Sequence, residues 1–131
     1  MLQQTVMRLP GDGARQLVAE AFEAATICPK YVSATGDEGG GPAKRTKVRT
    51  THAWSLVDRG FAGEESLLFE HRMTAATGTG DADLGGAAVL VVRVGDLIAT
   101  VEQVNGDHPA STRKLGTRAA AWLCAAATPP C

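Results

Sequence analysis

Apolar positions alternate or repeat at helical spacing along most of the chain, and the pattern predicts seven elements. Two segments repeat at helical spacing and five read as strands. The predicted helices span residues 12–28 and Arg113–Ala127, and the predicted strands are Leu2–Leu9, Val48–Val57, Glu65–Met73, Ala87–Val94 and Leu97–Val104. The order β-α-β-β-β-β-α predicts an α+β fold, in which the helices pack on one face of a twisted antiparallel sheet.

Residues that favour helix ends and turns bound these elements. Asp12 can cap the first helix, and Pro29 ends it. Ser111 or Thr112 can cap the last helix. Gly95-Asp96 is typical of a two-residue type II′ turn between the last two strands.

Two glycine-rich stretches, Ser33–Lys47 and Ala76–Gly86, predict long mobile loops within one domain that covers residues 1–131. The first is rich in basic residues, so we expect trypsin to cut there first, at Lys44, Arg45 or Lys47.

One strand register places similar residues opposite one another. If Leu56 faces Leu67, then Trp54 faces Phe69 and His52 faces His71, and strand alternation puts all six on one face. The hairpin Ala87–Val104 is apolar on both faces, which predicts a central place in the sheet.

The facing histidines are the sharpest candidate for chemistry. With Trp54 and Phe69 they form the predicted binding residues, His52 and His71 being able to bind a metal or to respond to pH. A zinc site needs at least three protein ligands, and no residue spacing supplies the third, so no metal is expected. The alternative is a partly buried pair bonded to each other or to backbone.

Other polar groups predict no catalytic residue and no cofactor. Glu64-Glu65 and Glu70 are interpreted as solvated charges. His108 lies beside Asp107 without the nucleophile elbow that a serine hydrolase needs. Gly39-Gly40-Gly41 precedes a proline and not the lysine of a phosphate-binding loop. An enzyme or metal-binding protein using the histidine pair stays as the alternative to a non-catalytic domain.

Composition excludes two classes of partner. The net charge is -1 and the charges are interspersed, which argues against nucleic-acid binding. No apolar run reaches the ~20 residues of a membrane span. Met1 leads directly into a predicted strand, so no signal segment is expected in this chain.

The three cysteines leave alternatives open. Cys124 lies on the helix face away from Leu115, where a tail turned by Pro129-Pro130 can return Cys131 to it, so we predict a Cys124–Cys131 disulfide and expect Cys28 to be a buried thiol. The competing outcomes are a Cys28–Cys124 bridge and three reduced thiols. A disulfide would indicate an oxidising compartment.

The last helix is apolar on several faces. Its predicted core stripe contains Leu115, Ala119, Trp122, Leu123 and Ala126, and alanines fill much of the rest. Either a second copy packs on it, giving a homodimer, or small alanines are tolerated at the surface.

Three runs carry a resemblance to a known family: Gly60–Ser66 after Trp54, Val91–Ile98, and Ala119–Cys124 with the closing cysteine. They resemble actinobacterial extracytoplasmic lipoproteins with sensor domains and, more distantly, the extracellular sensor domain of PknH-type receptor kinases. The resemblance implies a sheet with packed helices, disulfides, and binding of an unidentified small ligand or cell-envelope protein outside the membrane. This chain shows no lipobox, anchor or fourth cysteine, so its anchoring stays open.

Overall fold

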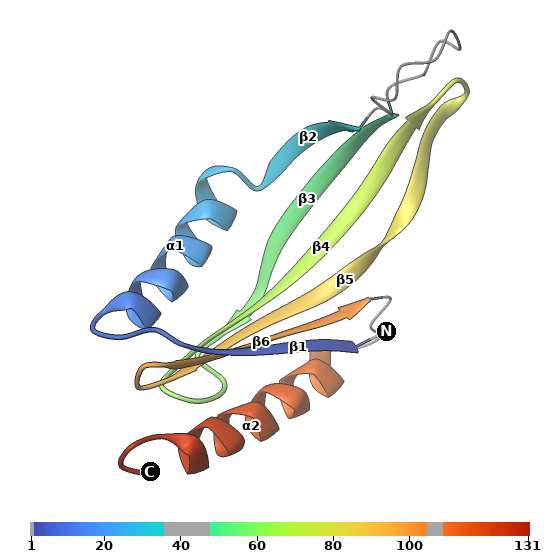
Figure 1. Ribbon diagram of the computed structural model, residues 1–131. Helices are drawn as coiled ribbons and strands as arrows, with labels where there is room; N and C mark the ends of the chain where they lie inside the picture. The colour runs from blue at the N-terminus through green and yellow to red at the C-terminus, as the bar shows by residue number, and fades with distance from the viewer. Residues whose placement is uncertain (1, 36–47, 105–108) are drawn as a thin grey trace, which may run out of the picture.

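The computed structural model describes residues 2–35, 48–104 and 109–131, which form one antiparallel sheet and two helices (Figure 1). The strand order across the six-stranded sheet is β1-β6-β5-β4-β3-β2. The elements are β1 (Leu2–Arg8), α1 (Gly13–Ile27), β2 (Lys30–Thr35), β3 (Val48–Arg59), β4 (Glu65–Thr77), β5 (Gly80–Val94), β6 (Leu97–Val104) and α2 (Pro109–Ala126).

The predicted α+β fold and the order of its elements are confirmed, with one strand in addition. That strand, β2, begins directly after Pro29 and takes the sheet edge next to β3. The Pro29 carbonyl accepts the Trp54 N–H at 2.7 Å and so starts the pairing. Ser33 and its next two neighbours therefore belong to a strand, where we expected a loop. The rest of that predicted loop, with its trypsin sites and glycine run, and Asp107-His108 lie outside the described residues.

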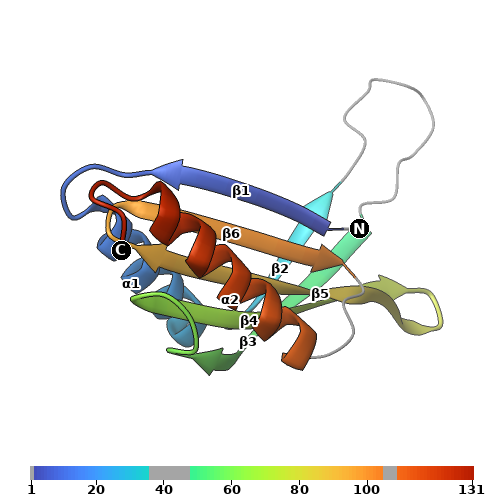
Figure 2. The ribbon, with the colours of Figure 1, turned by 90° about the horizontal axis from the view of Figure 1, so that it is seen from below.

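The two helices pack on opposite faces of the sheet, which corrects the prediction of one shared face. In Figure 2 α2 lies in front of the strands and α1 behind them. Leu90 and Val92 of β5 belong to the cluster beneath α2, whereas Val91 between them belongs to the cluster beneath α1. Successive side chains of a strand point to opposite faces, so a strand apolar at every position needs cover on both sides. The predicted central place of β5 and β6 is confirmed.

The predicted loop 76–86 is instead the far end of a hairpin. β4 and β5 pair as far as Thr77 opposite Gly80, leaving a two-residue turn, and one irregularity next to Met73 accommodates an extra residue on β5. Backbone pairing extends the strands into this segment despite its small and polar side chains. The two-residue turn predicted at Gly95-Asp96 is confirmed, and Gly95 has the positive φ of 61° that primed turns require there.

The buried stripe of α2 differs from the predicted one. Leu123 is fully buried and Ala119 nearly so, but Trp122 is 58% exposed and Ala126 is also exposed. Ala120, Cys124 and Ala127 pack on the core in their place. The sheet meets the helix on a face rotated by about one residue, which periodicity alone did not distinguish because alanines fill both sides. Asp12 precedes α1 as predicted, but its side chain makes no capping bond.

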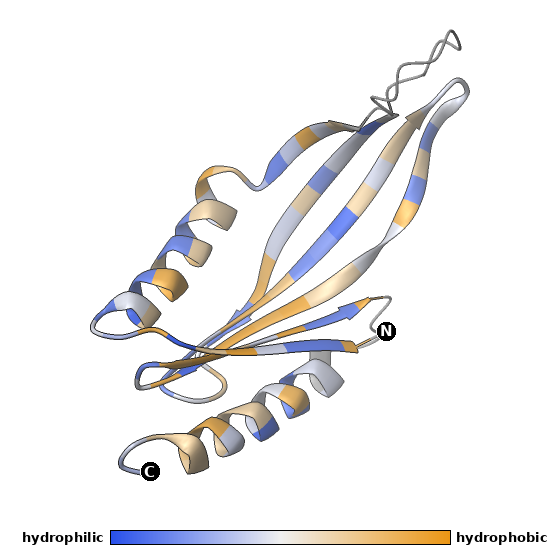
Figure 3. Cartoon of the chain, in the orientation of Figure 1, coloured by the Kyte–Doolittle hydropathy of each residue, from blue (hydrophilic) through white to orange (hydrophobic). Residues whose placement is uncertain are grey.

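The sheet is longer than the helices that cover it. α1 has 15 residues and β5 also has 15, which correspond to about 22 Å of helix and about 50 Å of strand. Figure 3 shows the most apolar strand segments between the two helices and more polar segments toward the far ends of β3, β4 and β5. The α1 face of the sheet thus continues past the end of the helix, and the candidate site lies at that border.

Candidate functional site

The histidines share a face as predicted, although the predicted partners are wrong by two residues. Trp54 lies opposite His71, and His52 lies opposite Met73. A shift of two residues keeps every side chain on its face, so His52 and His71 become diagonal neighbours. The β-bulge between Leu56 and Asp58 changes the spacing, and the sequence pattern did not indicate it.

Ser33, His52 and His71 form a continuous polar chain across three strands. The Oγ atom of Ser33 lies 2.7 Å from Nε2 of His52, and Nδ1 of His52 lies 3.0 Å from Nε2 of His71. All three side chains are partly buried. The chain can carry one hydrogen bond at each contact while both imidazoles stay neutral. The structure thus supports the alternative of a bonded histidine pair and adds a serine to it.

Aromatic rings stack on the two histidines of this polar chain. We call the set Tyr31, His52, His71 and Trp54 the histidine row. Tyr31 stacks on His52 with ring centroids 4.5 Å apart, and Trp54 stacks on His71 at 4.1 Å. The two imidazoles are themselves nearly parallel, with centroids 5.2 Å apart. The indole also meets Phe69 edge to face at 6.2 Å. These contacts fix the orientation of both imidazoles from either side.

Burial holds the pKa of His71 below its usual value, and the neighbouring His52 lowers it further. Glu102 acts in the opposite direction but does not outweigh them. A lowered pKa keeps His71 neutral at pH 7. The polar chain of Ser33, His52 and His71 can then exchange a proton without placing a fixed charge beside the apolar core.

An apolar cavity of about 390 Å³ opens between α1 and the sheet next to this row. Trp54 and Phe69 line it from the sheet, and Tyr31 lines it from the edge strand. The remaining lining comes from α1 and β5: Ala21, Ala24, Ala25, Cys28, Val89 and Val91. Its volume falls within the usual range for small-molecule sites. The small side chains of α1 create the space because they leave the aromatic rings partly uncovered.

Two of the four predicted binding residues therefore line the cavity, and the two histidines stack directly behind lining rings. Tyr31 and Ser33 are not among the residues predicted from the sequence, because the pattern of residues does not predict β2. The signal was present in Lys30–Val32, where a tyrosine and a valine follow a helix-ending proline. An apolar ligand in the cavity could place a polar group against the histidine row.

The free cysteine lies at this cavity. Cys28 is free and exposed, which corrects the prediction of a buried thiol, because it stands at the C-terminal cap of α1 and not on its packed face. Its Sγ lies 3.8 Å from the Lys30 carbonyl oxygen.

The predicted Cys124–Cys131 disulfide is present. Cys124 does not point away from the core as expected, since it packs partly against the cluster beneath α2. The tail is held by backbone as well, because the Cys131 N–H donates to the Cys124 carbonyl at 3.1 Å. The bridge lies on the opposite face of the sheet from the histidine row and is structural.

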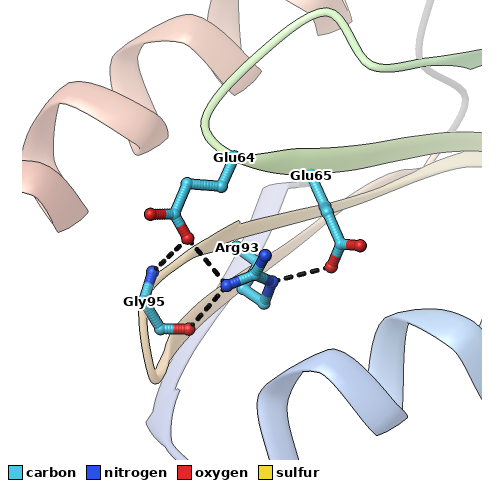
Figure 4. A network of polar contacts seen from close by, with 4 residues as sticks. All are labelled: Glu64, Glu65, Arg93 and Gly95. Carbon is cyan, nitrogen blue, oxygen red and sulfur yellow. Dashed lines mark hydrogen bonds and ion pairs between the residues drawn. The ribbon is translucent and has the colours of Figure 1, made fainter. Parts of the chain in front are cut away.

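A buried arginine organises the polar residues at the other end of the sheet (Figure 4). Arg93 is 6% exposed and lies 2.7 Å from a carboxylate oxygen of each of Glu64 and Glu65. Its guanidinium also donates to the Gly95 carbonyl, and the Gly95 N–H donates to Glu64. The two glutamates are thus structural partners and not simply solvated charges. Glu70, which pairs with exposed Arg72, does lie at the surface.

Neither a metal-binding cluster nor a membrane-spanning helix is present in the part of the chain that the structure describes. In the described ranges, no three histidine, cysteine, aspartate or glutamate side chains gather into a group that could hold a metal ion. No helix in the same part of the chain has both the length and the hydropathy to cross a bilayer.

No family model matches this chain, and no curated protein or solved structure is significantly similar to it.

Proposed function

We propose that this protein is an extracytoplasmic sensor-type domain that binds a small, largely apolar ligand between α1 and the sheet. The cavity of about 390 Å³, lined by Trp54, Phe69 and small residues of α1, carries the proposal. Three aromatic rings offer area for burial of apolar groups. The histidine row at the border offers hydrogen bonds to a polar head group, which would fix the orientation of the ligand.

The cellular compartment is part of the proposal. The Cys124–Cys131 disulfide is consistent with an oxidising environment outside the cytoplasm. The resemblance to extracytoplasmic sensor lipoproteins favours the same compartment and adds cell-envelope proteins as partners that would respond to the bound state. A homodimer through α2 stays a prediction, which sedimentation of wild type and Trp122→Gln would check.

Tryptophan fluorescence tests ligand binding directly. Trp122 is exposed on α2, so Trp122→Phe leaves Trp54 in the cavity as the only indole of the chain. We expect saturable titration with dodecanoate to change its emission. Ala24→Phe fills the cavity from an exposed helix position and should abolish the change. Ala126→Phe is the matched control, an exposed alanine of α2 that lines none of the cavities described.

The fluorescence signals of Ala24→Phe and Ala126→Phe distinguish binding in this cavity from binding elsewhere. Loss of the signal in Ala24→Phe and its retention in Ala126→Phe support binding in this cavity. Equal signals in both variants would place binding elsewhere. No saturable signal with fatty acids of eight to sixteen carbons, or with the neutral alcohols of the same lengths, contradicts the proposal.

A further inference from the structure

Going beyond ligand binding, we propose that Ser33 is a nucleophile that accepts the acyl group of a carboxylic ester, with His52 as its general base and His71 as a positioning residue. The juxtaposition of a hydroxyl, two linked imidazoles and an apolar cavity carries the inference. Sequence motifs gave no sign of it, because the three residues lie on three strands and Ser33 is not on a nucleophile elbow.

The distance between the Ser33 hydroxyl and the His52 imidazole suits a nucleophile and its general base. Ser33 Oγ and His52 Nε2 are 2.7 Å apart, within reach for proton transfer. In one polarity of the chain, Ser33 donates to Nε2 of His52, and the N–H at Nδ1 of His52 donates to Nε2 of His71. This is the arrangement of a serine-histidine-acceptor triad, in which the third group fixes the tautomer and orientation of the base. A neutral imidazole takes the place of the carboxylate.

His71 is suited to the accepting role. It must be neutral at Nε2 to accept the bond, and burial favours its neutral form. Trp54 stacks on one of its faces at 4.1 Å, which limits rotation of the ring. Tyr31 does the same for His52 at 4.5 Å. Both imidazoles are therefore held in place before a substrate arrives.

The sheet edge supplies backbone donors beside the nucleophile. The pairing of Pro29 with Trp54 is of the hydrogen-bonded type, so by alternation Tyr31 and Ser33 direct their backbone groups toward β3. Val32 and Ala34 then direct their N–H groups outward, at the edge that β2 forms in the described sheet. The N–H that follows Ser33 thus points away from every described strand, as an oxyanion donor would need to.

The reaction balances with water as the only other reactant. Ser33 Oγ attacks the ester carbonyl while His52 Nε2 takes its proton, and the C–O bond to the alcohol breaks after the tetrahedral intermediate forms. His52 returns the proton to the leaving alkoxide, which departs as the alcohol and leaves an acyl-serine. Water then attacks the acyl carbonyl while His52 takes its proton, and the bond between the acyl carbon and Ser33 Oγ breaks. His52 returns the proton to Ser33 Oγ, and a carboxylic acid is released.

The acyl class follows from the adjacent cavity. Tyr31 stacks on His52 and also lines the cavity, so an apolar chain attached to the reacting carbonyl can lie along that ring into the space beneath α1. We therefore assign medium-chain acyl esters as the preferred class. This preference rests on the proposed ligand cavity, whereas the nucleophile itself does not.

Covalent labelling tests the nucleophile. The full chain is treated with a fluorophosphonate and, separately, with p-nitrophenyl octanoate and acetate, and the modified residue is mapped by peptide mass spectrometry. We expect labelling of Ser33, its absence in Ser33→Ala, and a rate at least about 100-fold lower in His52→Gln. Ser55→Ala is the matched control, because Ser55 is an exposed serine of neighbouring β3.

Two variants test the positioning role of His71. His71→Gln keeps an oxygen that can accept the bond from His52, and His71→Phe keeps the stacked ring without an acceptor. Substantial labelling in the first and strong loss in the second, with equal circular dichroism spectra, support the assignment. Equal rates in both variants would show that the imidazole only packs.

Other outcomes overturn the proposal. An acyl group mapped to Cys28, whose exposed thiol lies at the same cavity, would assign the reaction to that cysteine. No covalent adduct on Ser33 with any probe would reject the nucleophile.

Dodecanoate binding by Ser33→Ala is measured in parallel, so that loss of chemistry is distinguished from loss of the ligand cavity. Labelling without preference for octanoate over acetate would reject the acyl cavity and retain the nucleophile.

Discussion

Removing the two glutamates around Arg93 should destabilise the fold more than removing the arginine itself. The arginine side chain is 7% exposed, whereas those of Glu64 and Glu65 are 54% and 42% exposed. In Glu64→Gln/Glu65→Gln the buried guanidinium keeps its charge and loses both counterions. In Arg93→Met the two carboxylates remain at the surface, where water can solvate them.

The expected magnitudes follow from this asymmetry. Stripping the partners from a buried charge costs 3–5 kcal/mol in general, and the amide oxygens of glutamine still accept hydrogen bonds, so we expect about 3 kcal/mol for the double variant. For a chain of 131 residues this corresponds to a decrease in Tm of about 11 °C. Arg93→Met exchanges a charged group for an apolar one and should cost about 1 kcal/mol.

Urea unfolding at pH 7 measures both losses of unfolding free energy. The triple variant Glu64→Gln/Glu65→Gln/Arg93→Met completes a mutant cycle with them. If the buried charge causes the loss, the triple variant should be close to Arg93→Met in stability, and not the sum of the two losses. Glu70→Gln is the control for removing a surface charge and should change the unfolding free energy by less than about 0.5 kcal/mol, since its pair with Arg72 is exposed. Arg93→Met as destabilising as the double variant would refute the argument.

Three further predictions follow from single contacts. Gly116→Ala should destabilise by about 1–3 kcal/mol in urea unfolding, because its Cβ would meet a ring carbon of Phe61 at 2.7 Å, and an unchanged midpoint would contradict this packing. The unfolding free energy of Cys124→Ser/Cys131→Ser should be lower by about 2.5 kcal/mol according to the loop-entropy relation. Urea unfolding of oxidised and reduced wild type should show the same difference. The lowered pKa of His71 means that the unfolded chain binds its proton first, so the unfolding free energy should fall as pH drops below 6.5, and less so in His71→Gln.

Local sequence patterns were sufficient for the fold class because seven of the eight elements carry their own periodicity. The central hairpin was predictable from alternation and from Gly95 at the turn, and the pairing of Cys124 with Cys131 from their closeness and the prolines between them. The face shared by the two histidines was predictable as well, because a two-residue error in register does not change the face of a side chain.

The candidate site itself could not be assembled in this way. Its serine lies on an edge strand of six residues, too short for a clear pattern, and the β-bulge in β3 changed which residues meet. The cavity depends on how α1 crosses the sheet, because its alanines leave space only where aromatic rings lie opposite.

The sequence by itself determined seven of the eight elements and the two-sided apolar pattern of the central hairpin, because these depend on periods of two and about 3.6 residues within short segments. Only the tertiary structure decided that the helices cover opposite faces, that Arg93 is buried between two glutamates, and that Ser33 meets His52. The physical reason is that such contacts join residues far apart in the chain. Their partners are selected by the register, the bulge and the packing of the complete sheet, which no local pattern specifies.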